Sequence, residues 1–496
     1  MFPKEKVNPA VIIHNEELKA YVKDSYTTEQ VKDIWNLLQS KNSLNFPTVE
    51  GRGLFKAALS LSEGDDDYTG YDNCWVRDNI HVAHAHYIIN KESMAADTVK
   101  DIATFWLKYR NRWNDCILGV VDYENDVMTR PHIRFNGTKL EENEQKWSHA
   151  QNDAIGYFTW LYAKLANEGF VEEPETDVLV LITLFMLSIK YWENQDNGHW
   201  EEAKKVEASS VGAAAAGFRE LGLLLNQHPS VLEKFNASFE RIAAELDLPT
   251  SRIAGEEILS TSPLNIVNYL EFAGTNKLKE ILPFESRDTG LERKTDGALL
   301  FLVYPLRIVD GYLAETIVND VIENILGDYG IKRYAGDSYW MANYKSIFSE
   351  ENRTTDFSDD MDSRDKHFKQ GQEAQWCIFD SIISCYYGLK YKEEYNSVSP
   401  NHERLQELHN KQILFFNRSV GQVTGEDCSF GPWHCPESYY IENGKYVSND
   451  VCPLLWTQAD LINALDQMVD VTNLHANLSN TKPTFKVKIV VKPKKF

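Results

Sequence analysis

Residues 178–189 read Val-Leu-Val-Leu-Ile-Thr-Leu-Phe-Met-Leu-Ser-Ile, and they form the longest apolar stretch of the chain. Thr183 and Ser188 interrupt it, and it is shorter than the roughly 20 residues that a membrane span needs. A helix that is apolar on all sides belongs inside a large protein. We therefore predict a buried helix here and no association with a membrane.

Helical periodicity continues on both sides of this stretch. Thr27 and Gln30 have the spacing of a capping box, and apolar residues follow at one-face spacing as far as Leu38. Clear alternation is confined to residues 484–491, which predicts one edge strand in the tail. Further helices are predicted near residues 79–90, 93–113, 151–167, 175–193, 208–226, 230–246, 263–272, 311–326, 372–390, 402–416 and 453–470.

These amphipathic helices have few ways to bury their apolar faces without a sheet. A helical solenoid would show a repeat of about 30–50 residues, and none is visible. We therefore predict an all-α fold, an α/α barrel with its active site at one end, built from loops far apart in sequence. The expected organisation is an N-terminal extension over residues 1–20, the barrel over 21–475 and a tail with the edge strand over 476–496.

Composition excludes several classes of function. The formal net charge of −23 opposes binding to phosphate backbones, so no nucleic-acid partner is expected. The seven cysteines have no zinc-type spacing, which predicts no structural metal. Residues 63–67 and 356–365 are acidic and are interpreted as solvated loops, with a calcium site as the alternative. Residues 1–17 lack the apolar core of a secretory signal, so we expect a cytoplasmic protein with reduced thiols.

Five short islands combine aromatic rings with charged residues at predicted helix ends. Sugars present flat C–H faces to aromatic rings, and their hydroxyls need polar or charged hydrogen-bond partners. Taken singly, each island also fits an ordinary helix start or a tryptophan-rich core. The islands are CWVRD at 74–78, KWSHAQND at 146–153, GHWEE at 198–202, RYAGD at 333–337 and CPESYY at 435–440.

In this order, the islands resemble the glucoamylase family of glycoside hydrolases, family 15, and its relatives, the α and β subunits of phosphorylase kinase. The segments that carry the resemblance are WVRDN, WSHAQNDA, HWEEAKKVEASSVG, RYAGDSYW, CPESYY and LLWTQADL, between residues 71 and 464. The resemblance implies an (α/α)6 barrel that removes glucose from non-reducing ends of α-glucans with inversion at the anomeric carbon.

The resemblance also implies roles for individual residues. Glu201 matches the general acid of the family and Glu437 matches the general base. Arg77 and Asp78 match the pair that holds the hydroxyls of the terminal glucose. The expected partner is an α-glucan or maltooligosaccharide, with no cofactor. The remaining residues expected to bind substrate are Trp75, Trp147, Trp200, Glu202, Arg333 and Trp456.

Inversion requires a protonated carboxyl at the leaving oxygen and a carboxylate that holds water on the opposite face, roughly 6.5–9.5 Å away. Packing by Trp200 and the neighbouring charge of Glu202 are expected to keep Glu201 protonated. Residues 436–440 are closer to the kinase-subunit form, so a regulatory or glucan-sensing protein on the same barrel stays an alternative. A third interpretation is a helical scaffold with a tryptophan-rich core. The glycosidic linkage stays open, because subsite loops decide it.

Overall fold

A computed structural model describes residues 9–59, 70–248 and 261–476. In this part of the chain, inner helices pack side by side in a closed ring, in which each contacts the next and the last returns to the first. They are buried along most of their length. The inner helices are α2 (Val76–Ile88), α5 (Asn152–Asn167), α7 (Ala208–Gln227), α11 (Leu299–Val303), α15 (Phe379–Tyr395) and α17 (Leu455–Ala476).

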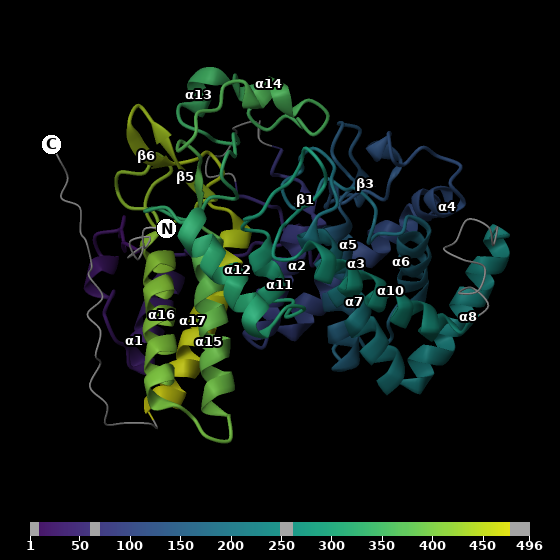
Figure 1. Ribbon diagram of the computed structural model, residues 1–496, viewed down its shortest axis with the longest axis horizontal. Coiled ribbons are helices and arrows are strands. Elements are labelled where there is room, and N and C mark those ends of the chain that lie inside the picture. Colours follow the sequence, from purple (N-terminus) through teal and green to yellow (C-terminus); the bar gives the residue numbers. More distant parts are fainter. Residues whose placement is uncertain (1–8, 60–69, 249–260, 477–496) are drawn as a thin grey trace.

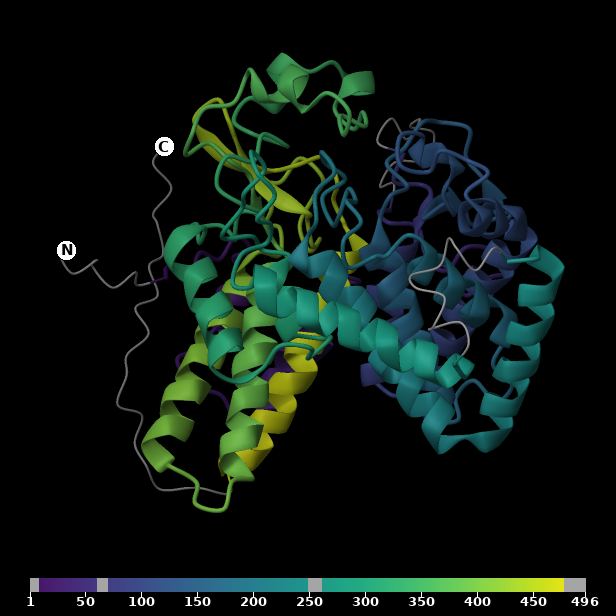
Figure 2. The same cartoon turned by 45° about the vertical axis from the view of Figure 1, so that its right-hand side comes forward.

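An outer layer of helices covers this ring (Figures 1 and 2). Most of its members are amphipathic and bury one face against an inner helix. Together the two layers form the predicted (α/α)6 barrel. The outer helices are α1 (Thr28–Ser40) on α17, α3 (Glu92–Lys108) on α2 and α5, α6 (Thr176–Ser188) beside α3, α10 (Pro263–Ile281) on α7, α12 (Gly311–Asn324) on α11, and α16 (His402–Gly421) on α15 and α17.

Helix α6 contains most of the apolar stretch 178–189 and is buried on all sides although it belongs to the outer layer. Two further helices, α4 (Arg110–Leu118) and α8 (Pro229–Leu246), pack on its outer face. The prediction of a buried helix is confirmed. The prediction of a single helix over 93–113 is wrong, because the helix is interrupted at Tyr109 and the stretch forms two helices, α3 and α4.

Two small antiparallel sheets lie at one end of the barrel and were not predicted. Their strands have two to five residues, too few for a visible alternation. The helix predicted over 372–390 therefore begins late, at Phe379, after a strand. One sheet contains β1 (Cys74–Trp75), β2 (Arg134–Asn136) and β3 (Glu141–Glu142), and the other contains β4 (Gln375–Trp376), β5 (Ser438–Glu442) and β6 (Lys445–Ser448).

The acidic stretch 356–365 was predicted to be a solvated loop, and this is wrong in part because it includes helix α14 (Met361–Asp365). Figure 1 shows α13 (Tyr344–Ile347) and α14 above the small sheets at the end of the barrel. The acidic stretch 63–67 and the edge strand predicted over 484–491 lie outside the described residues. Short 3-10 helices are η1 (Leu18–Ala20), η2 (Val127–Thr129) and η4 (Glu350–Asn352).

Helices α5 and α7 approach each other closely at glycine. A Cβ atom at Gly156 would lie 2.4 Å from the backbone of Ala213 and Ala214. The contact is reciprocal, because a Cβ atom at Gly217 would lie 2.8 Å from the carbonyl oxygen of Gly156. Backbone atoms of two packed helices cannot move aside as a flexible side chain can.

We therefore expect Gly156→Ala to lower the free energy of unfolding by about 1–3 kcal/mol, the usual cost of overpacking. Gly222→Ala, also on α7, is the matched control, because its Cβ would meet side-chain atoms and no backbone: Oδ1 of Asn268 at 3.3 Å and Cγ1 of Val267 at 3.9 Å. That variant gains helix propensity and should be neutral or slightly more stable. Denaturant unfolding measures both. Equal stability of wild type and Gly156→Ala would contradict the close approach.

Candidate active site

One pocket collects nine of the ten residues predicted from the sequence. It lies where the inner helices begin: Arg77 and Asp78 start α2, Trp456 starts α17, and Trp147 precedes α5. The pocket is therefore at one end of the barrel and is built from segments far apart in sequence, as predicted. The nine residues are Trp75, Arg77, Asp78, Trp147, Trp200, Glu201, Arg333, Glu437 and Trp456.

Glu201 stands at the tip of a tight loop between α6 and α7. An antiparallel bridge between Asp196 and Lys205 closes this loop. Glu201 itself has a φ of 58°, a left-handed conformation that non-glycine residues adopt rarely and that recurs at functional sites. The indole Nε1 of Trp200 donates a 2.8 Å hydrogen bond to Asp296, which fixes the loop against the barrel.

Three side chains hold the Glu201 carboxylate. Its Oε1 accepts hydrogen bonds from Trp75 Nε1 at 3.1 Å and from Gln151 Nε2 at 2.9 Å, and Arg77 Nη2 lies 3.7 Å away. Arg77 is fixed in turn by a buried ion pair with Asp153, at 2.7 Å, and by Gln151 Oε1, at 2.9 Å. Glu201 is therefore positioned by residues from the starts of α2 and α5.

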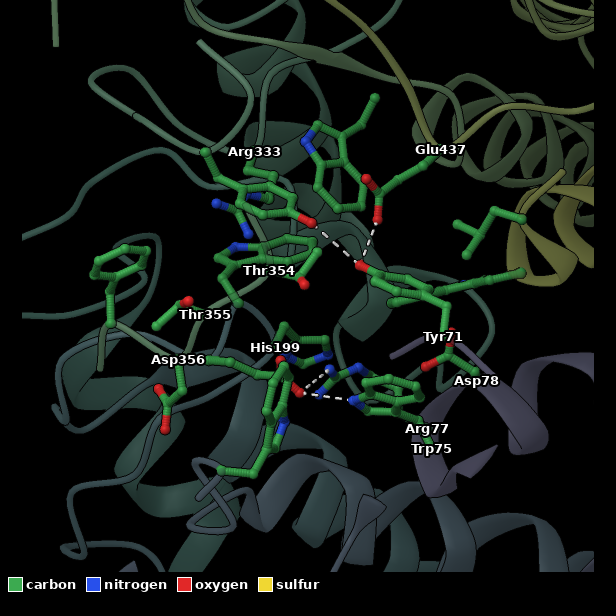
Figure 3. A pocket seen from close by; sticks show the side chains of 18 of the residues that line it. Tyr71, Trp75, Arg77, Asp78, His199, Arg333, Thr354, Thr355, Asp356 and Glu437 are labelled. Carbon is green, nitrogen blue, oxygen red and sulfur yellow. Dashed lines mark hydrogen bonds and ion pairs between the residues drawn. The ribbon is translucent and has the colours of Figure 1, made fainter. Parts of the chain in front are cut away.

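Glu437 lies on the other side of the pocket. Tyr71 donates a 3.0 Å hydrogen bond to its Oε1, and Asn449 donates a 2.5 Å hydrogen bond to its Oε2. Burial raises the pKa of Glu437 to about 7, although these two hydrogen bonds act in the opposite direction. Figure 3 shows Glu437 across the pocket from Trp75 and Arg77, which hold Glu201. The two carboxyls thus face the same space from opposite sides.

The remaining walls suit a polyhydroxylated ligand with apolar faces. Arg333 is held by Asp337 through hydrogen bonds of 2.7 and 2.6 Å, and its guanidinium lies 5.2 Å from the ring centre of Trp200. Burial raises the pKa of Asp78 to about 7, against the effect of the adjacent Arg77. Fixed cations, carboxyls and indole rings are the groups expected to bind sugar hydroxyls and sugar faces.

Glu202 does not line the pocket, contrary to the role expected for it. Its carboxylate is buried, with Arg293 at 2.8 Å and Lys205 at 3.8 Å. Burial alone would raise the pKa of Glu202, but the charges of Arg293, Lys205 and Arg333 outweigh it and hold the pKa well below its ordinary value. The direct partners of Glu201 are instead Trp75, Gln151 and Arg77.

Sequence reasoning missed several residues of the site. Gln151 and Tyr339 belong to the islands WSHAQNDA and RYAGDSYW, so the signal was present although they were not singled out. Residues 354–357 line the pocket, and two of them, Asp356 and Phe357, belong to the stretch 356–365 for which a solvated loop is predicted. Asn449 follows a short strand in a stretch without any motif, and only the fold brings it to Glu437.

Within residues 9–59, 70–248 and 261–476, no group of three or more His, Cys, Asp or Glu side chains is placed to hold a metal ion. None of the helices in this part of the chain is long and apolar enough to cross a membrane.

Opposed carboxyls in a pocket with indole walls, at one end of an (α/α)6 barrel, define the class as a glycoside hydrolase. Residues 36–481 match glycosyl hydrolases family 15, and the chain belongs to that family. The match covers the barrel except the first turns of α1, and it includes the loops that form the pocket.

Solved structures with the same fold include a wild-type glycosidase, with a TM-score of 0.57 and 14% identity, covering 90% of this chain and 99% of that one. The glucoamylase from Saccharomycopsis fibuligera has a TM-score of 0.54 and 12% identity, covering 91% and 97%. A bacterial glucoamylase complexed with acarbose has a TM-score of 0.51 and 15% identity, covering 86% and 54%. At these identities the similarity shows the fold alone.

Two curated proteins are similar in sequence. The uncharacterized lipoprotein YgeQ of Escherichia coli (strain K12) is 28% identical over 192 residues, which are 35% of this chain and 70% of that protein. The probable phosphorylase b kinase regulatory subunit alpha of Caenorhabditis elegans is 24% identical over 298 residues, which are 56% of this chain. The match spans only 22% of that subunit.

The cationic surroundings of Glu202 lead to a stability prediction. Glu202→Gln should lower the free energy of unfolding by about 1–3 kcal/mol at neutral pH, because Arg293 and buried Lys205 lose one of their two carboxylate partners and keep only Asp296 and Glu207. The pKa of Glu202 is lowered by folding, so its contribution is fully present above the ordinary value of 4.5 and is lost as the pH falls further. Urea unfolding at several pH values measures this difference.

Glu393→Gln is the control for that experiment, since Glu393 pairs with Arg307 and Lys390 on the surface. Exposed ion pairs contribute little, so this variant should unfold almost as wild type does. If the two variants have the same free energy of unfolding, Glu202 does not stabilise the fold through Arg293 and Lys205.

Proposed function

We propose that the protein is an inverting, exo-acting α-glucoside hydrolase that releases β-glucose from the non-reducing ends of α-glucan oligosaccharides. The observation that supports this most strongly is that Glu201 and Glu437 line one pocket, with Glu437 across it from Trp75 and Arg77, the partners of Glu201 (Figure 3). Two opposed carboxyls are the arrangement that inversion requires, because water must enter between one of them and the sugar.

In the proposed reaction, Glu201 donates its proton to the glycosidic oxygen as the bond to the anomeric carbon breaks. Glu437 removes a proton from a water molecule, and the oxygen of that water bonds to the anomeric carbon from the opposite face. The products are glucose of inverted configuration and a shortened glucan. The acid ends ionised and the base ends protonated, so proton exchange with solvent restores both groups.

The buried polar groups favour attack at a chain end. Asp78 and Arg77 are almost fully buried and present a carboxyl and a guanidinium to the pocket. Such groups bind best to a terminal sugar whose hydroxyls are all available, and the energy gained can assist distortion of the reacting ring. The bacterial glucoamylase of the same fold was solved with acarbose, and a variant of the similar glycosidase was solved with glucose.

A second candidate is a regulatory or glucan-sensing protein on the same barrel. It is favoured by the similarity to the phosphorylase kinase regulatory subunit over 56% of the chain. Such a protein would need the sugar-binding walls but no opposed carboxyls. The presence of both Glu201 and Glu437 in the pocket therefore favours the hydrolase.

Substitution of either glutamate tests the proposal. Glu201→Gln and Glu437→Gln should each reduce hydrolysis of maltose, isomaltose, trehalose or maltoheptaose by at least about 100-fold, the usual cost of losing a general acid or base. Glu442→Gln is the matched control, because Glu442 ends the strand after Glu437 and does not line the pocket.

Turnover above a tenth of wild type in both pocket variants would show that the roles are wrongly assigned. Sugar binding by wild type without any hydrolysis would favour the sensing protein instead. Calorimetric titration with glucose and maltose decides between these outcomes.

A further inference from the structure

Glu437 uses its two carboxylate oxygens differently. Oε1 accepts the hydrogen bond from Tyr71, a residue that lines the pocket, whereas Oε2 accepts from Asn449, which does not line it. Figure 3 shows the oxygen joined to Tyr71 pointing into the pocket. Asn449 therefore approaches Glu437 from behind, on the side away from any substrate.

Asn449 is itself fixed on three sides. It is fully buried directly after β6, and its backbone N–H donates to the carbonyl oxygen of Ser438 at 3.0 Å. Its side-chain Oδ1 lies 3.4 Å from the backbone nitrogen of Ser438, so the amide plane is set by the hairpin of β5 and β6. The remaining donor, Nδ2, is directed at Glu437.

On the pocket side of Glu437, Tyr339 and Tyr71 form a chain of hydrogen bonds that ends at Oε1. Burial raises the pKa of Tyr71 well above its ordinary value, with a further contribution from the charge of Glu437, so its hydroxyl keeps a proton to donate. Because that single proton is given to Glu437, the 3.2 Å contact between the hydroxyls of Tyr71 and Tyr339 has Tyr339 as the donor. An ionised carboxylate oxygen still has a lone pair for water after accepting one such bond.

We propose that Asn449 is a positioning residue for Glu437: it fixes Oε2 and favours the ionised carboxylate, leaving Oε1 as the oxygen that takes the proton from water. The role rests on the proposed function, since it concerns the base of that reaction. A hydrogen bond to the charged form of a carboxyl stabilises that form. Without Asn449, Glu437 would keep the hydrogen bond from Tyr71 and the charge of Arg333 in favour of its ionised form, but Oε2 would lose its donor.

The pH dependence follows from the groups that face Glu437. The acidic limb of kcat/KM should lie near pH 7, the pKa to which burial raises Glu437, because the base must be ionised to act. The pH at which this limb falls should depend on the ionisation of Glu437 and on the charged and titratable groups that face it. In the described part of the chain these are Tyr71, Tyr339, Arg333, Asp78, Tyr344 and Cys377.

Asn449→Ala removes a hydrogen bond to the ionised form, so the acidic limb should move upward by about one to two pH units. Asn449→Asp keeps the shape but places a second carboxyl against Oε2, and its limb should rise at least as far. Ser448→Ala, one residue earlier in the same hairpin, is the control and should leave the limb in place. The measurement is the pH profile of kcat/KM for a maltooligosaccharide.

A purely structural role would lower the rate equally at every pH and leave the limb unmoved in both Asn449 variants, and that result would overturn the proposal. If wild type hydrolyses no glucoside, the proposed function is wrong, but the role of Asn449 can still be tested. Infrared difference spectra of each protein against Glu437→Gln then follow the ionisation of Glu437 directly. The protonated-carboxyl band of Glu437 should persist to higher pH in the Asn449 variants than in wild type. Identical titrations would overturn the inference.

Discussion

The buried ion pair between Arg77 and Asp153 joins the starts of two inner helices, and the site depends on it. Arg77 belongs to α2 and Asp153 to α5, and their 2.7 Å contact is almost completely shielded from solvent. Arg77 also contacts Gln151, and both approach Glu201. Because this pair ties α2 to α5, the packing of these two helices fixes the position of the Glu201 carboxylate, which lies on a loop.

The opposite wall depends on different elements. Glu437 precedes β5, and its backbone is held by Cys377 after β4 and by Val451 after β6. A small sheet, rather than a helix, thus carries the second carboxyl. Because the two carboxyls are anchored in separate elements, their separation is set by the closed ring of helices between them. A closed ring can hold such a distance without any direct contact between the two groups.

The sequence predicted most of the helices and most of the residues that line the pocket, but not the short inner helix α11, the short strands or the polar partners. Helix α6 was recognisable because its apolar run is continuous, and the islands carried Trp75, Arg77 and Glu201. Strands such as β4 have too few residues to show a period. Glu202 was misplaced because adjacent residues in a tight turn point in different directions. Asn449 gave no signal, since its contact with Glu437 exists only in the folded chain.

The most direct measurement is the anomeric configuration of the first glucose released. Proton NMR of a fresh maltooligosaccharide digest, recorded before mutarotation, separates the two anomers. If Glu437 activates water on the face opposite to the bond that Glu201 protonates, β-glucose must appear first. Early α-glucose would contradict the account, because it would require carboxyls roughly 5–5.5 Å apart and a covalent intermediate.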